Sequence, residues 1–117
     1  MKFDIFSKLY NEAREYTDVE MYIAERGWQG WMEDYENGSD ATDIADILFY
    51  IYDLAHMGIK EMRSYMKLTF RAFSAIYSIP SRTVQDWEYG KSKTPEYMLK
   101  LVAYTIFTGR GRTDEQD

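Results

Sequence analysis

Four polar side chains with complementary hydrogen-bonding groups stand close together after Pro80: Ser81, Arg82, Gln85 and Asp86. A proline is well suited to a helix start, so a helix from Ser81 would carry all four on one side. A guanidinium can donate two hydrogen bonds to guanine, a glutamine amide can pair with adenine, and a carboxylate can accept from the amine of cytosine. Arg82 and Gln85 are the stronger candidates for base contacts, because Asp86 would also repel phosphate.

Residue types that serve catalysis or metal binding are sparse. Asp43 and Asp46 lie three apart, as a metal site or an acid/base pair could require, but an apolar helix stripe beside them favours a solvated polar face. His56 is the single histidine, has no nucleophile motif with it, and is interpreted as a helix-end residue. No cysteine and no phosphate-cradling glycine loop is present. We therefore expect no enzyme activity, no catalytic residue, no metal and no cofactor.

The charges are divided unevenly along the chain. Residues 1–55 hold 4 basic and 13 acidic side chains, residues 56–108 hold 8 basic and 4 acidic ones, and the remainder holds 2 and 3. The net charges are −9, +4 and −1, so only the second region could provide an electrostatic footprint for phosphate.

Length, composition and the first residues limit the compartment. A chain of 117 residues with 45% hydrophobic side chains can build one compact domain, or a small domain with a helical extension. The start of the chain lacks the features of a signal peptide, and its longest apolar run, residues 47–52, is too short to span a bilayer. With no cysteine to suggest an oxidising environment, we expect a cytoplasmic protein without membrane contact.

Apolar spacings of three and four residues predict helices in the first half. The first covers residues 3–16, and the second ends near Arg26, with Thr17 or Asp18 as its N-cap and Gly27 as its stop. An aromatic turn at residues 28–35 and a turn at residues 36–40 precede a helix from Asp43 to about His56, capped by Asp40 or Thr42. The stripes that predict the two longer helices are Phe3, Phe6, Leu9, Tyr10 and Ala13, then Ile44, Ile47, Leu48, Ile51 and Leu54.

A further helix is predicted after a break at Met57 and Gly58. Its apolar stripe comprises Ile59, Met62, Tyr65, Met66 and Leu68. Because alternating patterns typical of strands are absent, the fold class is predicted to be all-α. We expect an acidic helical extension over residues 1–56 for dimerisation or partner contact, a domain over 57–108, and a disordered tail over 109–117.

The segment from Leu68 to Phe107 carries a family motif: Leu68-Thr69, then Ala72 and Phe73, Ile79, and Trp87-Glu88-Tyr89-Gly90-Lys91, with Pro95-Glu96-Tyr97 opening a following helix. It resembles the lambda-repressor-like (XRE/Cro-type) helix-turn-helix family of prokaryotes and phages. The resemblance implies a lambda-repressor-like helical bundle and a repressor-like regulator of transcription that binds double-stranded DNA. Because one recognition helix reads only a short half-site, a homodimer is the expected state. It makes residues 81–89 the recognition helix.

Physical chemistry of the motif gives more detailed expectations. Thr69 can cap the first helix of the pair, while Ala72 is small enough for a close helix crossing. Ser78-Ile79-Pro80 should form the turn, and Gly90 should end the recognition helix. The side chains expected to point into the core are Phe73, Ile76, Val84 and Trp87.

Basic residues flank the predicted helix pair. Arg71, Lys91 and Lys93 are the natural contacts to phosphate, which position a protein on a duplex without reading its sequence. Many members of the family have, after Leu-Thr, a glutamine that bonds a phosphate, whereas this chain has Phe70.

Two functions of different class remain open. The first is a sequence-specific DNA-binding regulator, with the acidic half serving dimerisation or partner contact. The second is a protein-binding module of the same fold, for example an antitoxin or an acidic inhibitor that imitates nucleic acid and blocks a nuclease. Trp28, Trp31 and Tyr35 could belong to a partner-binding patch, although packing of the extension onto its domain is the more usual role for such a cluster.

Overall fold

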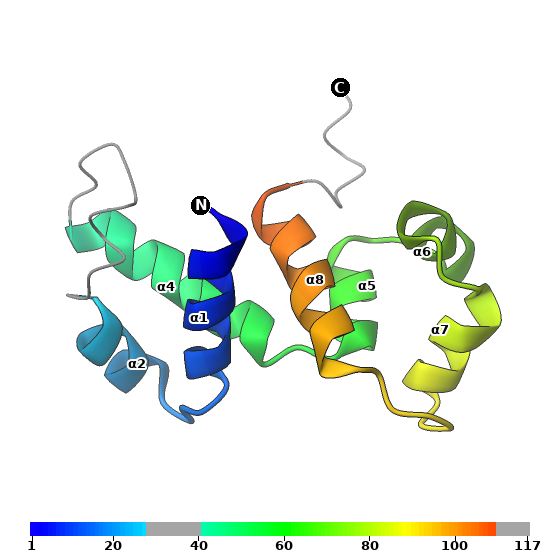
Figure 1. Ribbon diagram of the computed structural model, residues 1–117, viewed down its shortest axis with the longest axis horizontal. Helices are drawn as coiled ribbons and strands as arrows, with labels where there is room; N and C mark the ends of the chain where they lie inside the picture. The colour runs from blue at the N-terminus through cyan, green and yellow to red at the C-terminus, as the bar shows by residue number, and fades with distance from the viewer. Residues whose placement is uncertain (28–40, 110–117) are drawn as a thin grey trace. The chain divides into compact units, whose positions relative to one another are not determined.

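The computed structural model describes residues 1–27 and 41–109, and its regular structure over these residues is entirely α-helical (Figure 1). The all-α prediction is confirmed. The chain divides into unit 1, Met1–His56, and unit 2, Met57–Asp117. The turns predicted at residues 28–35 and 36–40, the aromatic cluster of Trp28, Trp31 and Tyr35, and the tail from residue 110 lie outside the described residues. Within the described ranges, no helix has the length and apolar character to cross a bilayer.

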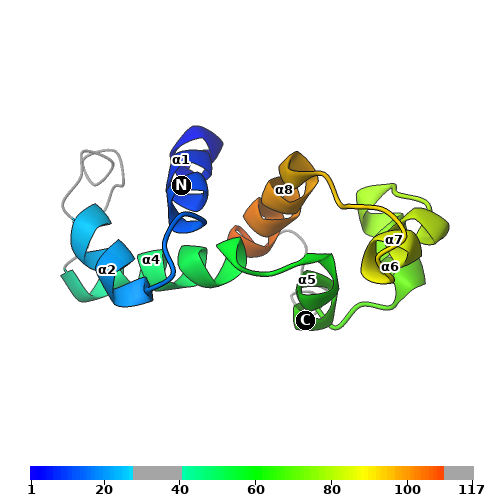
Figure 2. The ribbon, with the colours of Figure 1, turned by 90° about the horizontal axis from the view of Figure 1, so that it is seen from below.

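Unit 1 packs two short helices against a longer one (Figure 1, Figure 2). Helices α1 (Phe3–Ala13) and α2 (Val19–Arg26) both contact α4 (Ala41–Ala55). Phe3 is 38% exposed, against the prediction, because it is the first residue of α1 and lies beyond the packed turns. Ile47 of the second stripe is only half-buried. The other stripe residues are buried as predicted, namely Phe6, Leu9, Tyr10, Ala13, Ile44, Leu48, Ile51 and Leu54, and Tyr22 of α2 is buried with them.

The helix ends of unit 1 differ from the predictions by a few residues. Asp18 caps α2 by accepting from the amide of Glu20 at 3.0 Å, which excludes Thr17 as the cap. Helix α4 begins at Ala41, so Thr42 lies inside the helix and is not its cap. Helix α1 stops at Ala13 instead of residue 16, since the next amides bond three residues back and the carbonyl of Tyr16 turns toward α4.

Aromatic side chains of unit 1 bond to backbone carbonyls across helices. The buried Tyr22 hydroxyl donates to the carbonyl of Leu9 at 2.9 Å, and burial raises the pKa of Tyr22 above its usual range. His56 follows α4 directly, as expected of a helix-end residue; its Nδ1 lies 2.9 Å from the Tyr52 carbonyl and its Nε2 lies 3.0 Å from the Tyr16 carbonyl. The ring therefore ties the end of α4 to the connection between α1 and α2.

Unit 2 consists of four helices, α5 (Ile59–Tyr65), α6 (Phe70–Tyr77), α7 (Ser81–Glu88) and α8 (Glu96–Phe107), among its described residues. Helix α5 packs against both α7 and α8, and α6 packs against α7 (Figure 1, Figure 2). Their inner faces and the connections between them contribute to the apolar core. The helices supply Ile59, Met62, Phe73, Val84, Val102, Ala103 and Ile106, and the connections supply Met66, Leu68 and Ile79.

Three successive helices of unit 2 end in the same way. Lys67, Ser78 and Gly90 have φ values of 60°, 56° and 79°, the left-handed conformation that closes a helix. After α7 the amide of Lys91 donates to the carbonyl of Asp86 at 2.8 Å and the amide of Gly90 to that of Trp87 at 3.3 Å, a Schellman motif. The predicted stop at Gly90 is confirmed.

Some predicted core positions of unit 2 are wrong. Ile76 is 43% exposed, because α6 turns a different stripe inward: the Phe73 ring packs on the Tyr77 ring at 4.6 Å, and the Tyr77 hydroxyl lies 2.6 Å from that of Thr105 on α8. Tyr65, the last residue of α5, is 46% exposed, and Trp87 is half-buried instead of fully buried.

Candidate nucleic-acid interface

Helix α7 carries the four side chains predicted to contact bases. Arg82 extends into solvent with 80% of its side chain exposed, while Asp86 is 31% exposed and Ser81 and Gln85 are half-buried. Val84, on the inner side of the same helix, is fully buried. The helix therefore has an apolar inner side and a polar outer side, and the outer side presents donors and acceptors of the kinds that base edges require.

The start of α7 is fixed by the turn that precedes it. Ser78 takes the left-handed conformation, and Ile79 buries its side chain while its amide donates to the Ser74 carbonyl at 3.1 Å. The Ser74 hydroxyl donates in return to the Ile79 carbonyl. Pro80 then precedes the first helical residue, and its carbonyl accepts from the amides of Thr83 and Val84. The predicted turn of residues 78–80 is thus confirmed, and it leaves the direction of α7 little freedom.

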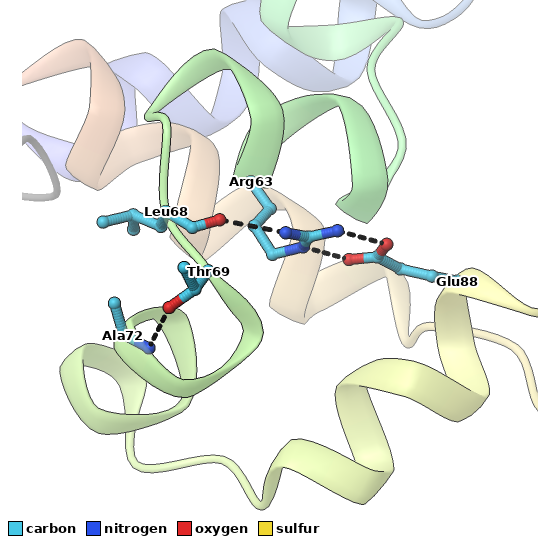
Figure 3. A network of polar contacts seen from close by, with 5 residues as sticks. All are labelled: Arg63, Leu68, Thr69, Ala72 and Glu88. Atoms are coloured by element: carbon cyan, nitrogen blue, oxygen red, sulfur yellow. Dashed lines mark hydrogen bonds and ion pairs between the residues drawn. The ribbon is translucent and has the colours of Figure 1, made fainter.

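The far end of α7 is fixed by an ion pair (Figure 3). Glu88, with 2% of its side chain exposed, accepts two hydrogen bonds from Arg63 of α5: from Nε at 2.6 Å and from Nη2 at 2.9 Å. The Nη1 atom of Arg63 donates to the Leu68 carbonyl at 2.9 Å. One guanidinium thus joins the end of α7 to the residues just before α6. The hydrogen bonds to Glu88 raise the pKa of Arg63 above its usual range.

The start of α6 completes this arrangement. Thr69 caps the helix as predicted, its hydroxyl accepting from the amide of Ala72 at 3.0 Å (Figure 3). The Arg63 guanidinium lies 4.0 Å from the centre of the Phe70 ring, which meets the Tyr89 ring edge-on at 6.4 Å. Phe70 therefore packs on the guanidinium of the ion pair in a cation–π contact.

The cations predicted to contact phosphate lie on two segments. Arg71 is exposed in the first turn of α6, and Lys91 and Lys93 are exposed in the connection between α7 and α8. Lys93 also lines an open pocket together with Lys60, a residue that was not among the predicted phosphate contacts. Glu61 and Glu88 line the same pocket, so carboxylates stand beside the two lysines there.

Arg63 and Glu88 are the important residues that sequence reasoning missed. Each stands four residues after a buried apolar residue, Arg63 after Ile59 and Glu88 after Val84, and so on the inner face of its helix. Two opposite charges on inner faces are costly to bury unless they pair. The spacing therefore indicates that each charge needs an opposite partner, but it does not identify that partner.

Comparisons of the chain with models of known families, with curated proteins and with solved structures give no match. Over residues 1–27 and 41–109, no three histidine, cysteine or carboxylate side chains gather as a metal site would require. The properties of α7 and its supports are therefore the basis for assigning a function.

Proposed function

We propose that the chain is a sequence-specific DNA-binding regulator of transcription and that unit 2 is a helix-turn-helix domain of the lambda-repressor-like kind. The observation that carries the proposal is the construction of α7. This helix has a buried inner side at Val84, supports at both ends in the Ser78–Pro80 turn and the Arg63–Glu88 pair, and an outer side with Arg82 exposed. A helix that enters the major groove needs this combination of rigidity and exposed polar groups.

The proposed contacts divide into two kinds. Arg82 and Gln85 read base edges in the major groove, with Ser81 beside them. Arg71, Lys91 and Lys93 neutralise phosphates on either side of the groove and set the register of the protein on the duplex. The net charge of +4 over residues 56–108 supports this division, because phosphate contacts provide much of the affinity of such domains.

A homodimer is part of the proposal. The outer face of a helix of eight residues reads only a short half-site. Two copies on one duplex would double the site, with half-site centres about 34 Å apart for one turn of DNA. The acidic residues of unit 1 then face away from the duplex, since their carboxylates repel phosphate.

Selection from random duplex DNA tests the proposal. The full chain should enrich one sequence, and its affinity for that duplex should fall linearly in a plot of log K against log salt. A scrambled duplex of the same length and composition is the control, and it should bind more weakly at every salt concentration. A chain that binds no duplex even at low salt contradicts the proposal.

A specific observation favours a second candidate, a protein-binding module. On α4, Asp46, Phe49 and Asp53 recur at three- and four-residue spacing, and all are exposed, Phe49 by 53%. An aromatic ring between carboxylates suits a basic protein partner, such as a nuclease that the chain would inhibit as a mimic of nucleic acid. Under this function the chain competes with nucleic acid for that partner and binds no duplex, so the same binding experiment separates the two candidates.

A further inference from the structure

Two residues of the proposed reading face interact with each other. The Nε atom of Arg82 lies 3.6 Å from an Oδ atom of Asp86, one helical turn further along α7. The guanidinium is largely exposed, but the carboxylate is only 31% exposed and is therefore the better ordered of the two groups. Asp86 can thus act as a fixed point for a long side chain that would otherwise sample many rotamers.

Helix stability does not account for this pair. The order with the base first and the acid four residues later is the less favourable one on a helix. Asp86 also lies in the last turn of α7, where the carbonyl end of the helix disfavours a negative charge. An exposed pair of this kind contributes little to folding. Near a duplex, the carboxylate would in addition repel phosphate.

We propose that Asp86 is a positioning residue that orients Arg82 for a bidentate contact to guanine. This inference rests on the proposed DNA-binding function and names the base that its reading face prefers. A carboxylate on the Nε side leaves the Nη1 and Nη2 atoms as the outward edge, and this edge matches the O6 and N7 acceptors of guanine. Asp86 therefore acts through Arg82 and does not itself read cytosine.

The test measures base discrimination on the duplex selected by the wild-type chain. At the base pair that Arg82 reads, replacing guanine by adenine should weaken wild-type binding about tenfold or more. Asp86→Asn keeps the size of the side chain and removes its charge, and it should lose most of that discrimination while binding a scrambled duplex as well or better. Asp4→Asn, the same change at an exposed position of unit 1, should leave discrimination unaltered.

A double-mutant cycle separates positioning from direct reading. In the Arg82→Ala background, Asp86→Asn should have no further effect on discrimination, because there is no guanidinium left to orient. Loss of discrimination in both backgrounds would mean that Asp86 reads a base itself, and unchanged discrimination in Asp86→Asn would mean that the pair has no role in recognition. Either result overturns the inference and leaves DNA binding intact, whereas a wild-type chain without sequence preference overturns the proposed function and the inference with it.

Discussion

Unit 1 and unit 2 both connect helices with an ion pair, but the two pairs differ in geometry and burial. In unit 1, Arg26 of α2 forms an ion pair with Glu12 of α1 through one pair of atoms at 3.0 Å, with both side chains 25% exposed. The Tyr22 hydroxyl and the His56 ring contact the backbone carbonyls of Leu9 and Tyr16. In unit 2, a charged pair, Arg63 and Glu88, spans from α5 to α7. The bidentate, nearly buried pair of unit 2 fixes the direction of α7 more strictly than a single, partly exposed contact can, as the proposed DNA-reading role of α7 requires.

The largest expected effect concerns Glu88. Glu88→Ala leaves the Arg63 charge without its partner in a site that is mostly buried, and should lower the free energy of unfolding of unit 2 by about 3 kcal/mol. Urea unfolding followed by circular dichroism, with amide exchange to locate the loss, measures the effect. The double variant Arg63→Met with Glu88→Met should recover most of the stability, because no unpaired charge remains. A cost below about 1 kcal/mol for Glu88→Ala would show that the pair does not support α7.

A smaller effect is expected in unit 1. Tyr22→Phe removes the hydrogen bond to Leu9 and should cost about 1 kcal/mol at neutral pH. Burial raises the pKa of Tyr22 in the folded state, so the neutral hydroxyl stabilises unit 1 fully below the unfolded pKa of about 10 and this contribution is lost as the pH rises above it.

Unfolding midpoints between pH 8 and pH 12 measure this dependence. The loss in alkali should be less steep in Tyr22→Phe, but still present, because the pKa values of Tyr16 and Tyr77 are also raised. Tyr97→Phe, an exposed control in unit 2, should behave as the wild-type chain does. An alkaline loss that is equally steep in Tyr22→Phe would argue against the buried hydroxyl as its source.

The smallest effect concerns the connections. The described residues with left-handed φ all lie in unit 2, and Ser78 takes that conformation without the freedom of glycine. Ser78→Gly should therefore raise the stability of unit 2 by about 0.5–1 kcal/mol, since relief of the left-handed strain exceeds the entropy that glycine adds to the unfolded chain. Ala75→Gly, inside α6, should instead lower stability by about 0.5–1 kcal/mol. Thermal unfolding of both variants checks the opposite signs, and a loss in Ser78→Gly would contradict the prediction.

Local chemistry made the helix ends of unit 2 predictable. Thr69, Pro80 and Gly90 each have a side-chain or backbone property that allows few positions other than a cap, a first turn or a stop, and all three occur where expected. The packing of α6 was less predictable. Ile76 and Tyr77 are adjacent and both could cover a core, and the choice depends on Thr105 of α8, which lies far along the chain.

The candidate site shows the same limit. The exposed polar face of α7 could be listed from its spacing, because a helix surface depends on nearby residues alone. The contacts that support α7 could not be predicted in this way. The Arg63–Glu88 pair and the Phe70 ring that packs on it come from three different helices, α5, α7 and α6. An ion pair between Arg82 and Asp86 was predictable from their four-residue spacing, in addition to the separate base contacts expected of each side chain.

The most direct test of the proposed reading helix compares the base preferences of the wild-type chain and of Arg82→Ala, measured by selection from the same pool of random duplexes. The variant should keep the preference at other positions and lose it at one base pair per half-site, with a loss of about 1–3 kcal/mol in binding free energy to the wild-type sequence. Lys91→Ala should in contrast weaken binding to all sequences alike and make the salt slope shallower by about one. An Arg82→Ala variant whose base preferences equal those of the wild-type chain would contradict the assignment of α7 as the helix that reads DNA.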